Sequence, residues 1–219
     1  MFIGHYGVGF AAKSLAPRVS LGALFLAAQF LDLLCASLLL LGVEHVRIAP
    51  GATAVTPLVF EHYPYSHSLA ATLVWALLVG GGYLLIRRKR AGALVLGGLV
   101  ISHWLLDAVV HIPDLPLFPG GATLIGLGAW SSLPVAVAVE LPLFLFGVWL
   151  YGRATAPLDA TGRWGYAALV GFLLAAYATT LFGRPAPSVA AVAWVGQAQW
   201  LLVLWGYWID QHRRATARA

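Results

Sequence analysis

Six long runs of apolar residues constrain this chain more than any other feature of its sequence. Each run has about the 20 residues that an α-helix needs to cross a bilayer. Hydrocarbon offers no water to satisfy backbone polar groups, so runs of this length are expected to be helices. The expected spans are residues 19–43, 66–86, 91–112, 130–151, 164–183 and 189–209.

The composition excludes most soluble classes of protein. Hydrophobic residues make up 61% of the chain and charged residues 10%, whereas a soluble domain carries about 25% charged residues. Disordered chains, coiled coils and ordinary cytosolic enzymes are therefore excluded. The single cysteine, Cys35, excludes an intrachain disulfide and a cysteine-based zinc site. We predict an all-α integral membrane bundle in one domain, residues 1–219.

The basic residues predict how the bundle is oriented. All four basic clusters fall on one side if the chain crosses six times with both termini in the cytoplasm. These clusters are Lys13 and Arg18, Arg87 to Arg90, Arg153 with Arg163, and Arg213, Arg214 and Arg218. No basic run exceeds four residues, so we expect no nucleic-acid partner. The Ala, Gly, Leu and Arg content suggests a bacterial inner (plasma) membrane.

The first 12 residues are apolar but too short to cross a bilayer. They are not a cleavable signal peptide, because the cations follow the apolar stretch and no small-residue cleavage site is evident. We expect this segment either to lie on the inner surface or to enter the membrane as a re-entrant helix.

Ionisable residues inside the expected spans point to function, because a charged group in a bilayer costs several kcal/mol unless it is paired or faces water. At about 1.5 Å rise per residue, Asp32 lies roughly 16 Å, His103 roughly 13 Å and Glu140 roughly 15 Å below the outer face. His67 begins its span near that face, and Asp107 lies roughly 8 Å below it. Four helices thus place carboxylates and imidazoles in the outer half of the membrane.

The residues His103, Asp107 and His111 share one helical face, because they are spaced four residues apart. A histidine and an aspartate at this spacing can chelate one ion. His111 lies about 12 Å along the axis from His103, so we expect it to support a ligand side chain, to contact the substrate or to lie at the rim of the site. The same residue types also occur in helix-packing ion pairs and in proton relays. His62 lies in a polar segment, EHYPYSHS, just before a span.

Four stretches of the chain resemble the YdjM-like family, bacterial inner-membrane proteins described as metal-dependent hydrolases. The stretches are GHYGVGFAAK from Gly4, FLD from Phe30, HYPYSHSL from His62, and LGGLVISHWLLDAVVHIPDLPLFP from Leu96. They follow the family's order over about the first 120 residues, and residues 121–219 match only as additional spans. The resemblance implies the metal ligands His5, Asp32, His67, His103 and Asp107.

Two departures from the family pattern affect this expectation. The family's Pro-Asp-x-Asp is Gln29-Phe30-Leu31-Asp32 here, and its Arg-Gly-x-Thr is Tyr63 to Ser66. One metal ion rather than two, a different substrate head group, or loss of activity would each fit these changes.

The leading hypothesis is a metal-dependent hydrolase that acts on a membrane lipid or another amphiphilic phosphoester from the outer half of the bilayer. The ligand types favour zinc, and the ligand set is loosely similar to that of the bacterial zinc phospholipase C. Glu140 would take the water proton or orient a ligand, and His62 or His111 would protonate the leaving group. A proton- or ion-coupled transporter and a catalytically inactive structural protein are the alternatives. The oligomeric state is left open.

Overall fold

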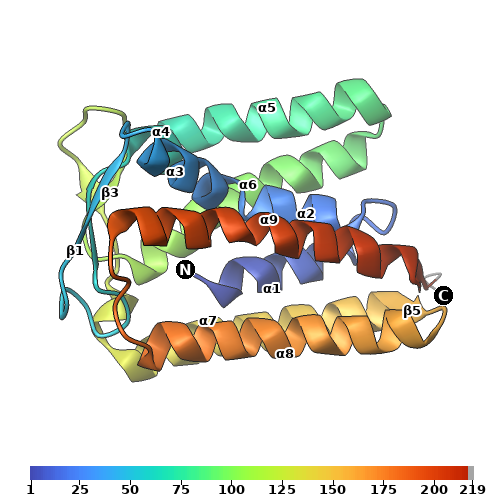
Figure 1. Ribbon diagram of the computed structural model, residues 1–219. Helices are drawn as coiled ribbons and strands as arrows, with labels where there is room; N and C mark the ends of the chain where they lie inside the picture. The colour runs from blue at the N-terminus through green and yellow to red at the C-terminus, as the bar shows by residue number, and fades with distance from the viewer. Residues whose placement is uncertain (217–219) are drawn as a thin grey trace.

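Among residues 1–216, which the computed structural model describes, five helices are long and apolar enough to cross a membrane. The bent pair α2 and α3 passes the same test of length and composition when its two helices are taken together. Together they make a multi-pass, all-α membrane bundle, as predicted (Figure 1). The helices are α2 (Leu21–Ala28), α3 (Phe30–Leu40), α5 (Leu69–Arg87), α6 (Arg90–Val110), α7 (Leu133–Ala154), α8 (Ala160–Phe182) and α9 (Val189–Gln211).

The first expected span is not one continuous helix. The axes of α2 and α3 differ by 58°, and the chain breaks at Gln29, whose φ of −105° and ψ of 8° are not helical. The break ends the hydrogen-bonding ladder of α2, so backbone carbonyls near Ala28 become available to other donors. It also places Asp32 in the first turn of α3. The prediction of an unbroken helix over 19–43 is therefore wrong.

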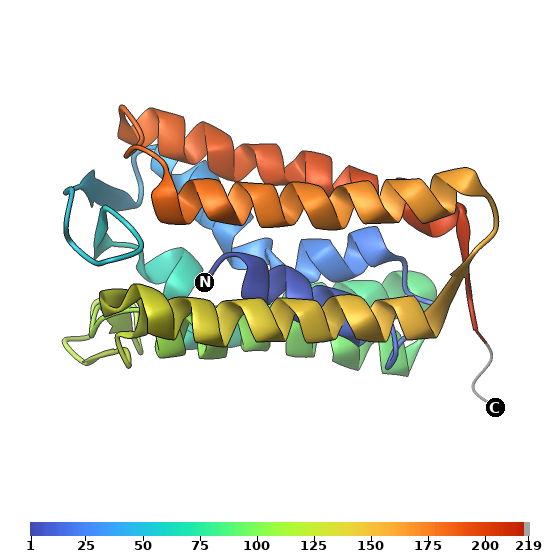
Figure 2. The same ribbon diagram turned by 90° about the horizontal axis from the view of Figure 1, so that it is seen from below.

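The segment at the N-terminus forms α1 (Ile3–Ala12), which is enclosed by the bundle. Eight of its ten residues are buried, and it packs between α7 and α2 (Figure 2). A Cβ at Gly147 on α7 would collide with the backbone oxygen of Gly7, so the two glycines allow α1 and α7 to approach closely. Met1 also lies inside the bundle. The N-terminal segment therefore does not lie on a surface of the bundle, which was one of the two positions expected for it.

Short strands and turns occupy both ends of the bundle, where the sequence predicted only connectors. One end carries an antiparallel hairpin and a short helix before α5, and the other end carries a strand pair near the C-terminus (Figure 1). The elements at the first end are β1 (His45–Ile48), β2 (Leu58–His62), α4 (Pro64–His67), β3 (Leu115–Pro116), β4 (Leu124–Ile125) and the 3₁₀ helix η1 (Ala129–Ser131). Strands β5 (Thr155–Pro157) and β6 (Arg213–Ala215) pair at the other end.

The connections that carry the basic clusters gather at the β5–β6 end. The α1–α2 and α5–α6 connections lie there together with β5 and the C-terminus (Figure 1). This arrangement agrees with the single-sided distribution expected from the sequence. Arg218 lies outside the described residues, and the cytoplasmic location of this end is still a prediction.

Aromatic side chains fill the centre of the bundle around α1. Tyr6, Phe10, Phe25, Phe144 and Tyr151 are fully buried and belong to one cluster. Phe10 makes edge contacts with three of the others, at centroid distances of 4.8 to 6.1 Å. Because lipid tails are themselves apolar, close packing of this kind holds membrane helices together. The aromatic cluster fixes α1 and so fixes the position of His5.

Candidate metal centre

Four of the residues expected to bind metal surround one point near the β1–β2 end of the bundle. Asp32 comes from the first turn of α3, and His67 is the last residue of α4. His103 and Asp107 lie one turn apart on α6. All are buried except Asp32, whose side chain is 32% exposed. Three separate segments of the chain thus contribute side chains to one cluster.

Four of the distances between the ligand atoms are close to those around one tetrahedral ion. Nε2 of His67 lies 3.5 Å from Oδ1 of Asp32 and 3.6 Å from Oδ2 of Asp107. Nε2 of His103 lies 3.6 Å and 3.1 Å from the same two oxygens. Tetrahedral zinc with ligand bonds of 2.0–2.1 Å requires neighbouring ligand atoms to lie about 3.3 Å apart. Four edges of the ligand polyhedron therefore have the required length.

The far side of the His103 ring is fixed by the backbone. Its Nδ1 lies 2.7 Å from the carbonyl oxygen of Ala28, at the break between α2 and α3. A carbonyl can only accept, so Nδ1 carries the hydrogen, and Nε2 is the atom that would present its lone pair to an ion. Among the described residues, Nε2 makes no regular hydrogen bond, and its polar contacts are those with the carboxylates of Asp107 and Asp32. The ring is therefore oriented as a metal ligand would be.

The His67 ring is oriented by a chain of two side chains. Its Nδ1 lies 2.7 Å from Oγ of Ser66, and that hydroxyl donates to Oε2 of Glu44 at 2.6 Å. The single hydroxyl hydrogen is used on Glu44, so Nδ1 of His67 is the donor to Ser66 and Nε2 presents a lone pair. Glu44 also accepts the backbone N–H groups of Tyr65 and Ser66. A carboxylate that orients a metal-binding histidine through hydrogen bonds is typical of metal sites.

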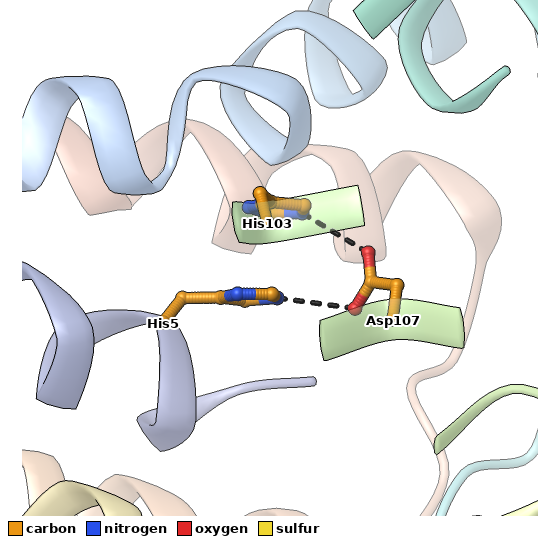
Figure 3. A group of neighbouring side chains, drawn as sticks. All are labelled: His5, His103 and Asp107. Carbon is orange, nitrogen blue, oxygen red and sulfur yellow. Dashed lines mark hydrogen bonds and ion pairs between the residues drawn. The ribbon is translucent and has the colours of Figure 1, made fainter. Parts of the chain in front are cut away.

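The fifth expected ligand, His5, contacts the other oxygen of Asp107. Its Nε2 lies 3.1 Å from Oδ1 of Asp107, and its ring stacks on that of His103 with centroids 3.6 Å apart (Figure 3). The amino group of Met1 also pairs with Oδ1. Ligand atoms of His5, His103 and Asp107 lie within 4.8 Å of one another. Since Oδ2 of Asp107 faces the other two histidines, we assign His5 to orienting the carboxylate.

Glu140, expected to act on the water, lies beside the cluster and not within it. One of its oxygens accepts the backbone N–H of Phe2 at 2.8 Å, and the other accepts the indole N–H of Trp130 at 3.2 Å. It is buried and lines the same cavity as Asp32 and Asp107. A carboxylate has about four acceptor positions, so Glu140 can still bind a water or substrate hydrogen.

The two histidines expected to protonate a leaving group have different surroundings. His111 is buried on the cavity wall, and its Nδ1 lies 2.9 Å from Oδ1 of Asp114. His62 is exposed on β2, paired in register with His45, and does not line the cavity. The structure therefore places His111 on the wall of the cavity and His62 outside it.

Residues that the sequence reasoning did not assign to the site support it from outside. Ser66 directly precedes His67, a proximity that could have indicated its role, but Glu44 is 23 positions away and carried no such signal. Tyr63 donates to Asp114 at 3.3 Å. Burial, reinforced by the Asp114 carboxylate, raises the pKa of the Tyr63 phenol, so this donor stays protonated.

A cavity of about 610 Å³ opens onto the cluster. Its polar end includes Asp32, His67, Asp107, His111, Trp130 and Glu140. The volume lies within the range of about 300–1,000 Å³ that small-molecule sites occupy. The cluster can therefore meet a ligand as well as an ion.

Comparison of this chain with protein-family models, with curated proteins and with solved structures finds no match. The resemblance to the YdjM-like family accordingly stays a prediction, and any function must be argued from the site itself.

Proposed function

We propose that this protein is a membrane-embedded, metal-dependent hydrolase that acts on the phosphoester head group of a lipid or related amphiphile. The observation that carries the proposal is the arrangement of His67, His103, Asp32 and Asp107. Their facing atoms lie 3.1 to 3.6 Å apart, and the far nitrogen of each of these histidines is already committed to another partner.

The donor set favours zinc among the divalent ions. Two imidazole nitrogens and two carboxylate oxygens in a four-sided arrangement suit Zn²⁺, whereas Mg²⁺ and Ca²⁺ prefer more oxygen ligands. When bound, such an ion would polarise a phosphoryl oxygen and lower the pKa of a water, and this chemistry requires a coordination position beyond those that the four side chains fill.

The residues around the ion position have distinct roles in the proposed reaction. His5 holds Oδ1 of Asp107, so that Oδ2 faces His67 and His103. Glu140 binds the attacking water and takes its proton, and His111, held by Asp114, protonates the leaving oxygen. Both side chains line the cavity into which the cluster opens. Water and head group would meet there, at the outer end of the bundle.

The relay alternative is less consistent with the interior of the bundle. One route for a proton to the other face runs from His5 along α1 to Lys13, which pairs with Asp210 at 2.7 Å. The intervening positions on α1 carry no ionisable group except the phenol of Tyr6, and both Tyr6 and Phe10 are fully buried in the aromatic cluster. Along α1, the cluster of ionisable residues therefore ends at His5, in one half of the bundle. A position in one half of the membrane is suitable for a site that binds lipid head groups.

Metal content tests this proposal on the detergent-purified protein. Mass spectrometry is expected to find about one equivalent of zinc in the wild type and none in His103→Ala or Asp107→Ala. His62→Ala is the matched control, since this histidine lies outside the cluster, and it should retain the ion. A screen of lipid phosphoesters follows for the metal-loaded protein. A wild type that stays metal-free after zinc is added back would contradict the proposal.

A further inference from the structure

The cavity continues well beyond the metal centre, along α8 and α9, with Cys35, Ala36 and Leu39 of α3 forming a further wall. These two antiparallel helices form one flank of the bundle (Figure 2). On α9 the lining runs from Val192 to Trp205, a length of about 20 Å at helical rise. The side chains between these limits are mostly apolar, and Phe172 on α8 packs against Trp205 at the deep end. The polar end at the cluster therefore leads into a long apolar arm.

Two hydrogen-bonding atoms in this arm have no partner among the described residues. They are the hydroxyl of Tyr177 and the indole nitrogen of Trp205. Tyr177 is only 4% exposed, so its hydroxyl is withheld from bulk water. An unpaired buried polar group costs about 1–3 kcal/mol, which a ligand with an acceptor atom would relieve. The arm is thus built for a molecule that is apolar but carries oxygen atoms.

The arm opens sideways, toward the lipid. Phe172, Val195 and Leu201 line it and are also exposed, by 50%, 71% and 67%. These side chains lie on the flank of membrane-spanning helices, where the surroundings are hydrocarbon. A chain from one leaflet spans about half of a 30 Å hydrocarbon core, which the arm can accommodate. A lipid can therefore enter laterally without leaving the bilayer.

The volume limits how much of a lipid can fit. A group the size of a water molecule occupies about 30 Å³, and a methylene is of similar size, so the cavity holds roughly 20 such groups. This corresponds to one long chain with part of its head group. A second chain would have to stay in the bilayer outside α8 and α9.

We propose that the α8–α9 arm binds one hydrocarbon chain of the substrate, while the Tyr177 hydroxyl donates to an oxygen in the linkage between chain and head group. This inference rests on the proposed function, because it takes the phosphoester at the metal centre as the head group. It makes the substrate a long-chain phosphoester and makes chain length a determinant of binding.

A photoreactive alkyl phosphate tests the chain site directly. The probe is cetyl phosphate with a diazirine near the end of its chain, added to the full-length protein in detergent micelles. Irradiation and peptide mapping should place the label on residues 172–177 of α8 and 196–205 of α9. Cetyl phosphate without the diazirine should compete, and octyl phosphate should compete much less well.

Two variants of α8 form a matched pair for this test. Ala176 lines the arm, so Ala176→Trp should fill it and reduce labelling by about tenfold or more. Ala178 is exposed and does not line the cavity, so Ala178→Trp should label like the wild type. Tyr177→Phe, which only removes the hydroxyl, should weaken the competing cetyl phosphate by about three- to tenfold, as the loss of one hydrogen bond implies.

The outcomes separate this inference from the proposed function. Labelling elsewhere, or labelling of the arm that Ala176→Trp leaves unchanged, would overturn the chain site even if zinc is bound at the cluster. Labelling of the arm that Ala176→Trp removes would support the chain site. If the same protein then binds no metal, the hydrolase proposal fails and the chain site stands.

Discussion

The substitution Ser66→Ala tests the geometry of the metal centre without removing a ligand. Ser66 Oγ links His67 Nδ1, 2.7 Å away, to the carboxylate of Glu44, 2.6 Å away. Alanine fills nearly the same space but leaves the Nδ1–H group of the buried ring without its partner. Glu44 keeps the backbone N–H groups of Tyr65 and residue 66, so the local fold should survive. The variant therefore isolates the orientation of one imidazole.

The expected loss follows from the behaviour of partners that orient metal ligands. Removing such a partner weakens metal binding by about 10- to 100-fold, which corresponds to about 1.4–2.7 kcal/mol. Competition between the protein and a chromophoric zinc chelator measures the affinity in detergent. Ser102→Ala is the control, because Ser102 lies beside His103 on α6 and its hydroxyl donates to the carbonyl of Leu99 within the same helix. If Ser66→Ala binds zinc as tightly as wild type, His67 does not ligate through Nε2 and the reasoning fails.

Two further predictions concern the scaffold. Gly147→Ala should destabilise the protein by about 1–3 kcal/mol, because the added Cβ overpacks against Gly7. Gly152→Ala on the same helix adds a Cβ that meets nothing within 4 Å, so it should be neutral or stabilise the protein by up to about 1 kcal/mol. Equal thermal unfolding of the two variants in detergent would refute the close approach of α1 and α7. Asp159 caps α8 and binds His212 at 2.7 Å, and the hydrogen bond from His212 lowers the pKa of Asp159 below its usual 3.8. A carboxyl group whose pKa is lowered on folding stabilises the folded state above its usual pKa, and this stabilisation is lost as pH falls through the lowered pKa. The wild type should therefore lose thermal stability in the acid range by an increment that Asp159→Asn does not show. Parallel profiles of thermal stability against pH for the two proteins would contradict this.

The membrane spans could be predicted because their signal is local. A run of about 20 apolar residues predicts a membrane-spanning helix without reference to the rest of the chain. Five of the expected runs correspond to single long helices in the structure. The break at Gln29 gave no comparable signal, since its neighbours are as apolar as those of any other span. Its consequence, the Ala28 carbonyl that fixes His103, depends on how α2 and α6 pack and could not be derived from spacing.

Most members of the candidate metal centre could be predicted from the sequence, but their geometry could not. Ionisable residues at similar depths identified Asp32, His103 and Asp107, because unpaired charges do not persist in hydrocarbon. Depth alone could not decide which atoms face one another, so the sequence did not show that Glu140, expected to take the water proton or orient a ligand, is held by Phe2 and Trp130. His62 is exposed because β2 pairs with β1 in a hairpin. This pairing joins two separate segments, so the sequence around His62 alone could not predict it.

Zinc K-edge X-ray absorption on the purified, zinc-loaded protein tests the central claim most directly, because it reports the atoms around the ion. The account predicts four nitrogen or oxygen neighbours at about 2.0–2.1 Å with the outer-shell signature of two imidazoles, reduced to one imidazole in His67→Ala. A sulfur neighbour at about 2.3 Å, or a spectrum that His67→Ala and His103→Ala leave unchanged, would contradict it.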